Sequence, residues 1–63
     1  MILRFSDLSE IDLAHLNRER VKELKRSSIA VINSTMSEMV KREEWEQIEE
    51  YNKMLDYLDE RGR

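Results

Sequence analysis

The chain has 63 residues, a net charge of −3 and no cysteine, and 40% of its residues are charged. Without cysteine it can form no disulfide scaffold and no zinc or redox site built on thiolates, and with one glycine and no proline it is neither collagen-like nor loop-rich. The composition is typical of a charged, all-α protein, and so short a chain is expected to form a single domain over 1–63.

The N-terminal part of the sequence predicts a packed tail followed by a first helix. Apolar residues lie on both parities of 1–8, which favours an apolar tail packed across the helices over a strand. Ser9 and Asp12 have the spacing of a capping box, so a helix is predicted over 10–26. Serine, β-branched and turn-forming residues then predict a break within 27–35. The apolar stripe of this helix consists of Leu13, Leu16, Val21 and Leu24.

The C-terminal half predicts one long helix. Thr35 and Glu38 repeat the capping-box spacing, and no helix breaker follows until Gly62, so the helix is predicted over 36–60. Two helices joined by a short connection form a two-helix antiparallel hairpin. A single hairpin of this size buries too little surface to be stable alone, so we expect it to dimerise into a helical bundle.

No signature of a reaction is present in the sequence. The serines have only His15 as a possible base, the one glycine is the penultimate residue, and the Glu-x-x-His spacing of bundle metal sites is absent. We therefore expect no catalysis, no cofactor and no metal. No apolar run approaches the roughly 18 residues of a membrane span, and residues 1–6 are too short for a signal-peptide core, so we expect a cytoplasmic protein without a membrane partner.

The first candidate site combines the only tryptophan with acidic residues of the predicted second helix. Trp45 lies away from the apolar stripe of that helix, where its large flat surface is a candidate hot spot for binding another protein. The carboxylates of this site are Glu43, Glu44, Glu46, Glu49 and Glu50, and Lys41 and Arg42 also lie around the tryptophan. Glu43, Glu44 and Gln47 also interrupt the apolar face, either as a polar layer that meets a partner or as side chains that reach solvent. Alternatively, Trp45 covers the other helix or the tail.

The second candidate site is a row of basic residues on the predicted first helix. Arg18, Lys22 and Arg26 follow one another at i, i+4 and i+8, and Arg20 and Lys25 accompany them. Like charges at this spacing repel each other and favour an acidic counterpart: the second helix, a partner protein or the phosphates of nucleic acid. Nucleic acid is the less favoured alternative, because the chain is acidic overall and no aromatic residues interleave the row.

No family is recognised across the whole chain, but two partial resemblances exist. Residues 42–51, which mix Trp45 and Tyr51 with glutamates, are similar to the toxin-binding helical tails of small bacterial antitoxins. The hairpin architecture resembles plasmid copy-number regulators, which dimerise into four-helix bundles and bind RNA loops. We therefore expect a non-catalytic protein-interaction module that acts as a small phage or bacterial regulator, adaptor or inhibitor. The alternatives are a nucleic-acid-binding helical dimer and a small structural or assembly protein.

Overall fold

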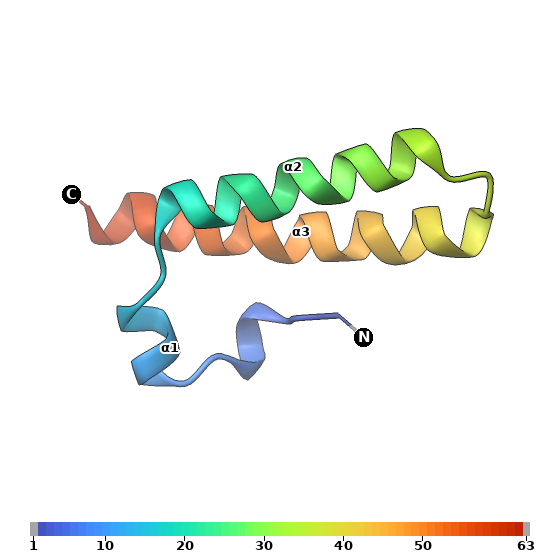
Figure 1. Ribbon diagram of the computed structural model, residues 1–63. Coiled ribbons are helices and arrows are strands. Elements are labelled where there is room, and N and C mark those ends of the chain that lie inside the picture. The colour runs from blue at the N-terminus through green and yellow to red at the C-terminus, as the bar shows by residue number, and fades with distance from the viewer. Residues whose placement is uncertain (1, 63) are drawn as a thin grey trace.

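The computed structural model describes residues 2–62, which form helical elements joined by short connections (Figure 1). A 3₁₀ turn, η1 (Phe5–Asp7), and a short helix, α1 (Glu10–Ala14), precede two long helices, α2 (Arg18–Ser34) and α3 (Glu38–Arg61). The two long helices lie side by side and run antiparallel, and residues 2–62 contain no strand. The predicted all-α antiparallel hairpin is therefore confirmed.

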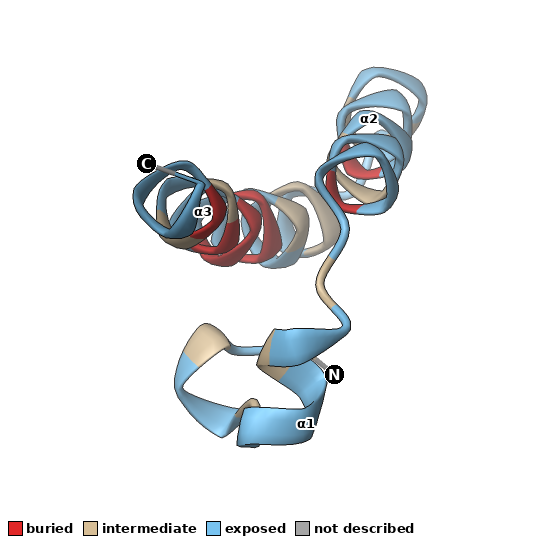
Figure 2. Ribbon diagram, turned by 90° about the vertical axis from the view of Figure 1, so that its left-hand side faces the viewer, coloured by how far each residue is buried: buried red, intermediate tan, exposed pale blue. Residues whose placement is uncertain are grey.

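The longest helix, α3, spans the whole molecule. Its 24 residues extend about 36 Å at 1.5 Å per residue, close to the 39 Å long axis of the described chain. The residues before α2 lie below the α2–α3 pair and form a second layer in the end-on view (Figure 2). This N-terminal segment, residues 2–17, covers one face of the hairpin and leaves the opposite face open.

The start of α1 agrees with the predicted capping box. The Ser9 side chain accepts a hydrogen bond from the N–H of Asp12, and the Asp12 carboxylate accepts one from the N–H of Ser9. These bonds to Ser9 lower the pKa of Asp12 below its ordinary value. The helix that follows has only five residues, and none of them is buried.

The prediction of one continuous helix over 10–26 is wrong, because Asn17 starts a new helix. The backbone of Asn17 is extended, and its side chain accepts hydrogen bonds from the N–H groups of Glu19 and Arg20. Asparagine is among the most favoured N-cap residues, so it caps α2 here. The interruption turns the chain so that Leu16 packs against the core while α1 lies below the hairpin (Figure 2).

The predicted end of the first helix at residue 26 is also wrong, because α2 continues to Ser34, and the break predicted somewhere within 27–35 begins only at Thr35. Ser28 is buried in the helix, and the hydroxyl of Ser34 donates to the main-chain oxygens of Ala30 and Val31. Such bonds to the preceding turn accommodate serine inside a helix. Packing against α3 therefore outweighs the modest helix propensity of the serine and β-branched residues.

Ser37, and not Thr35, caps α3, so the helix predicted over 36–60 starts two residues too early. The Ser37 side chain accepts a hydrogen bond from the N–H of Val40. The hydroxyl of Thr35 accepts one from the N–H of Ser37, within the connection between the helices. At its other end α3 reaches Arg61, one residue beyond the prediction.

The core lies between α2, the second half of α3 and the N-terminal segment. Met54 and Val21 are its most deeply buried side chains, with 1% and 2% of their surface exposed. The buried cluster consists of Val21, Tyr51, Met54 and Leu58, with Phe5, Leu8, Leu16, Leu24, Leu55 and Tyr57 packed against it. The N-terminal segment thus packs across the helices as the sequence favoured, although Met1 of the predicted tail lies outside the described residues.

The end of the hairpin near the α2–α3 connection is more open. The large apolar residues exposed there are Ile29, Val31, Met36, Met39 and Trp45. This distribution leaves apolar surface available for association, and the expected dimer stays a prediction.

Candidate protein-binding surface

Trp45 lies in the first half of α3 with 55% of its surface exposed. It is not among the residues that pack against the core cluster. Gln47 and Glu50, which hold the N-terminal segment, point about 140° to 160° away from Trp45 around the helix at roughly 100° per residue. Trp45 therefore lies on the open face of the hairpin, and the alternative that it covers the tail is wrong.

Ile29 of α2 lies on the same open face as Trp45. An ion pair between the exposed side chains of Arg18 and Asp59 joins α2 to α3. Ile29 follows Arg18 by eleven residues, about three full turns, so both point the same way from α2. Trp45 precedes Asp59 by fourteen residues, so these two leave α3 within roughly 40° of each other. The ion pair thus joins the side of α2 that carries Ile29 to the side of α3 that carries Trp45. Ile29 and Trp45 therefore share one face of the hairpin, which we call the Trp45 face.

The five predicted carboxylates do not gather around Trp45. Glu49 is its neighbour at i+4, whereas Glu46 and Glu43 point roughly 100° and 160° away from it. Glu44 is half-buried and Glu50 is buried. Of the five carboxylates, only Glu49 therefore lies beside Trp45, and the expected ring of acidic residues around the tryptophan is not formed.

Basic side chains lie beside both residues of the exposed apolar pair. Neighbours on one face of a helix are three or four residues apart. At this spacing Lys41 and Arg42 lie beside Trp45, and Lys25 and Arg26 lie beside Ile29. Arg26 and Arg42 are exposed, and both lysines are half-buried. The cations of the Trp45 face are thus Lys41 and Arg42 beside Trp45 on α3, and Lys25 and Arg26 beside Ile29 on α2.

The basic row is only partly neutralised within residues 2–62. Arg18 pairs with Asp59, and Arg20 lies 3.8 Å from a carboxylate oxygen of Glu23. The residues of the row that form no ion pair with the described part of the chain are Lys22, Lys25 and Arg26. Internal ion pairs therefore account for Arg18 and Arg20 but not for Lys22, Lys25 and Arg26.

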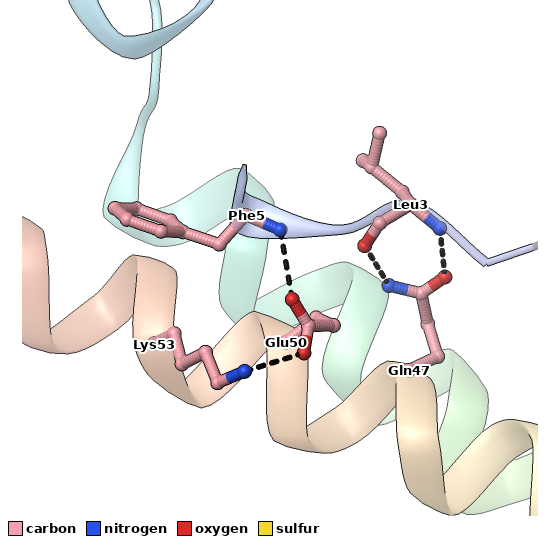
Figure 3. A network of polar contacts seen from close by, with 5 residues as sticks. All are labelled: Leu3, Phe5, Gln47, Glu50 and Lys53. Carbon is pink, nitrogen blue, oxygen red and sulfur yellow. Dashed lines mark hydrogen bonds and ion pairs between the residues drawn. The ribbon is translucent and has the colours of Figure 1, made fainter. Parts of the chain in front are cut away.

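On the face that the N-terminal segment covers, Gln47 and Glu50 bind the main chain of that segment (Figure 3). The Gln47 Oε1 accepts a hydrogen bond from the N–H of Leu3 at 2.7 Å, and its Nε2 donates to the C=O of Leu3 at 2.8 Å. Glu50 accepts one hydrogen bond from the N–H of Phe5 and one from the Nζ of Lys53, each at 2.8 Å.

The predicted place of Glu50 on an exposed acidic surface is therefore wrong. Its carboxylate is buried, and the hydrogen bond from Lys53, followed by that from the N–H of Phe5, lowers the pKa of Glu50. The role of Gln47 was not predicted. The available signal was its position on the apolar face, where a buried amide must find hydrogen-bonding partners.

Glu44 lies close enough to the core for its charge to affect Tyr51. Burial raises the pKa of Tyr51, and the negative charge of Glu44 raises it further, whereas Arg20 lowers it.

Within residues 2–62, no group of three or more histidine or acidic side chains is arranged to hold a metal ion. In the same part of the chain, no helix combines the length and apolar character needed to cross a bilayer. In comparisons with known proteins, no family model matches the chain, and no curated protein or solved structure is similar to it. The likenesses to antitoxin tails and copy-number regulators therefore stay resemblances of composition and architecture.

Proposed function

We propose that the protein is a non-catalytic interaction module that binds another protein through the Trp45 face and thereby regulates or inhibits that partner. The observation that supports this proposal is the exposure of Trp45, with Ile29 on the same face, where the N-terminal segment gives no cover. Tryptophan provides a large contact area with few rotatable bonds, so its burial at an interface loses little entropy.

The charges beside this apolar pair favour an acidic partner. Arg26 and Arg42 are exposed next to Ile29 and Trp45, with Glu49 as the carboxylate neighbour of the tryptophan. Complementary charges at the rim of an interface orient the partner and increase the association rate. The sequence favoured a basic partner for an acidic surface, whereas the basic neighbours of Trp45 and Ile29 favour an acidic partner.

Single-stranded nucleic acid is the second candidate ligand. A tryptophan on which a base can stack, bordered by Lys25, Arg26 and Arg42, combines the two features that such binding uses. The net charge of −3 opposes it at long range. We therefore rank it below an acidic protein.

The test compares Trp45→Ala with Ile11→Ala, a control at an exposed apolar residue of α1. A partner captured by the unmodified chain is identified, purified and titrated against both variants. Trp45→Ala should weaken binding at least about 30-fold, as expected for a hot spot, and Ile11→Ala no more than about twofold. Equal affinity for both variants would refute the assignment of the contact to the Trp45 face.

The same tryptophan separates the two candidate ligands. Trp45 is the only tryptophan in the chain, so its intrinsic fluorescence reports on this face alone. Quenching by an oligothymidylate that weakens steeply between about 50 and 200 mM salt would replace the protein partner by nucleic acid. Fluorescence that does not respond to the oligonucleotide would support the protein partner.

A further inference from the structure

We propose that the face of α3 carrying Gln47 and Glu50 is a peptide-binding site, occupied here by residues 2–8 of the same chain. Its expected ligand in trans is an extended, basic segment of another protein that carries an aromatic residue. Gln47 and Glu50 point about 140° to 160° away from Trp45 around α3, so the inference does not depend on the proposed function.

The hydrogen bonds at this site recognise main chain and not side chains. Gln47 pairs with both the N–H and the C=O of Leu3, as a neighbouring strand would, and Glu50 accepts from the N–H of Phe5 two residues later (Figure 3). Alternate residues of an extended chain present their main-chain groups to the same side. Any extended segment with free N–H groups at these two positions can therefore make the same bonds.

Side chains add a preference for an aromatic residue. The ring of Phe5 lies 5.7 Å from that of Tyr57, in a tilted arrangement, and also packs against the core cluster. Leu8 packs against the same cluster, whereas the side chain of Leu3 is exposed. The ligand therefore needs the equivalents of Phe5 and Leu8, joined by a 3₁₀ turn like η1 after the extended residues, but tolerates variation at Leu3.

A positive charge between the two bonded positions is also favoured. Arg4 stands between Leu3 and Phe5, and its charge helps to lower the pKa of Glu50, although less than the hydrogen bonds from Lys53 and from the N–H of Phe5. Glu43 precedes Gln47 by four residues and therefore borders the same site. The expected ligand is thus an extended segment with a basic residue directly before an aromatic one.

The segment that now fills the site is held by its hydrogen bonds to Gln47 and Glu50 and by the partly buried Phe5 and Leu8. Neither η1 nor α1 contains a buried residue. Its advantage over a free peptide is the covalent tether, which corresponds to an effective concentration in the millimolar range for a short linker. The apparent affinity for a peptide in trans is accordingly reduced by the small fraction of molecules in which the site is open.

The test uses the full chain with Leu3→Pro, which removes the N–H bound by Gln47, and Leu3→Ala, which keeps it. Leu3 is exposed, so both variants should retain the circular dichroism of the unmodified protein. A fluorescent peptide with the sequence of residues 2–8 is titrated by anisotropy. It should bind Leu3→Pro about 2- to 10-fold more tightly than Leu3→Ala, the ratio that one hydrogen bond provides. The same peptide N-methylated at its Leu3 equivalent should lose this gain.

Adding Gln47→Ala to Leu3→Pro should also abolish the gain. Equal affinity for all variants would overturn the proposal, because the peptide would then bind elsewhere. Self-association of Leu3→Pro that the peptide reverses would show that a second copy, and not a foreign segment, occupies the site. In the unmodified chain, saturating peptide should accelerate hydrogen exchange at the N–H groups of Leu3 and Phe5, and unchanged exchange would count against displacement.

Discussion

The substitution Met54→Ala tests whether one chain forms its own core. Met54 is 1% exposed and belongs to the cluster between α2, α3 and the N-terminal segment. Removing a fully buried methionine side chain to alanine costs about 2–5 kcal/mol, the sum of lost transfer free energy and the cavity left behind. A domain of this length has a free energy of unfolding of only about 3–5 kcal/mol. The variant should therefore lose most of its stability.

Met39→Ala is the matched control on the same helix. Met39 is 72% exposed, so the identical change removes no buried contact of a single chain. Both substitutions replace methionine by alanine within α3 and change helix propensity by similar small amounts. Urea unfolding followed by circular dichroism at 222 nm should place the Met39→Ala midpoint near that of the unmodified chain. The Met54→Ala midpoint should lie far lower, or the variant should be unfolded without urea.

Two results would contradict this reasoning. If the free energies of unfolding of Met54→Ala and Met39→Ala differed by less than about 1 kcal/mol, the core would not be centred on Met54. A large loss in Met39→Ala, dependent on protein concentration, would show that a second copy covers the open end of the hairpin. That second result would support the expected dimer and move part of the core to the interface between copies.

Three further predictions concern helix capping and pH. Ser37→Ala should lower the free energy of unfolding by about 0.5–2 kcal/mol through loss of the α3 cap, and Thr35→Ala should lower it less, as measured by urea unfolding. The pKa of Glu50 is lowered from 4.5, so its stabilising effect should be lost as pH falls below about 4.5, and Glu50→Gln should flatten this part of a thermal-melt profile. The pKa of Tyr51 is raised from 10.0, so the stability of the unmodified chain should fall as pH rises above about 10. Tyr51→Phe has no phenol at this position, so it should lack this part of the fall. An unchanged pH profile in either variant would contradict the corresponding assignment.

The hairpin itself was predictable because its signals are local. The capping box at Ser9 depends on residues three apart, and the helix of α3 depends on periodicity without an interrupting proline or glycine. The interruption at Asn17 was missed, although asparagine is a strong N-cap, because an apolar stripe that continues through it suggested one helix. The extension of α2 to Ser34 was missed for a different reason, since packing against α3 outweighs local propensity there.

The surroundings of Trp45 were not predictable from its own helix. The sequence around it is rich in glutamate, but a helix distributes consecutive residues around its axis, so most of those carboxylates point elsewhere. Ile29, with Lys25 and Arg26 beside it, comes from α2, and only the register of the antiparallel pair brings these residues to the same face as Trp45. A candidate site that joins two helices therefore requires the tertiary structure, even where each residue type was noticed in the sequence.

The polar residues on the apolar face of α3 explain why the N-terminal segment takes an irregular path. A helix packed on this face would satisfy its own main-chain groups and leave Gln47 and Glu50 buried without partners, at a cost of about 1–3 kcal/mol for each unsatisfied group. An extended chain offers free N–H and C=O groups at alternate residues, and these are the groups that the two side chains bind. Polar side chains at these two positions therefore select an extended segment over a third long helix. For the same reason, replacing Gln47 by leucine should weaken the docking of residues 2–5 while leaving α2 and α3 paired.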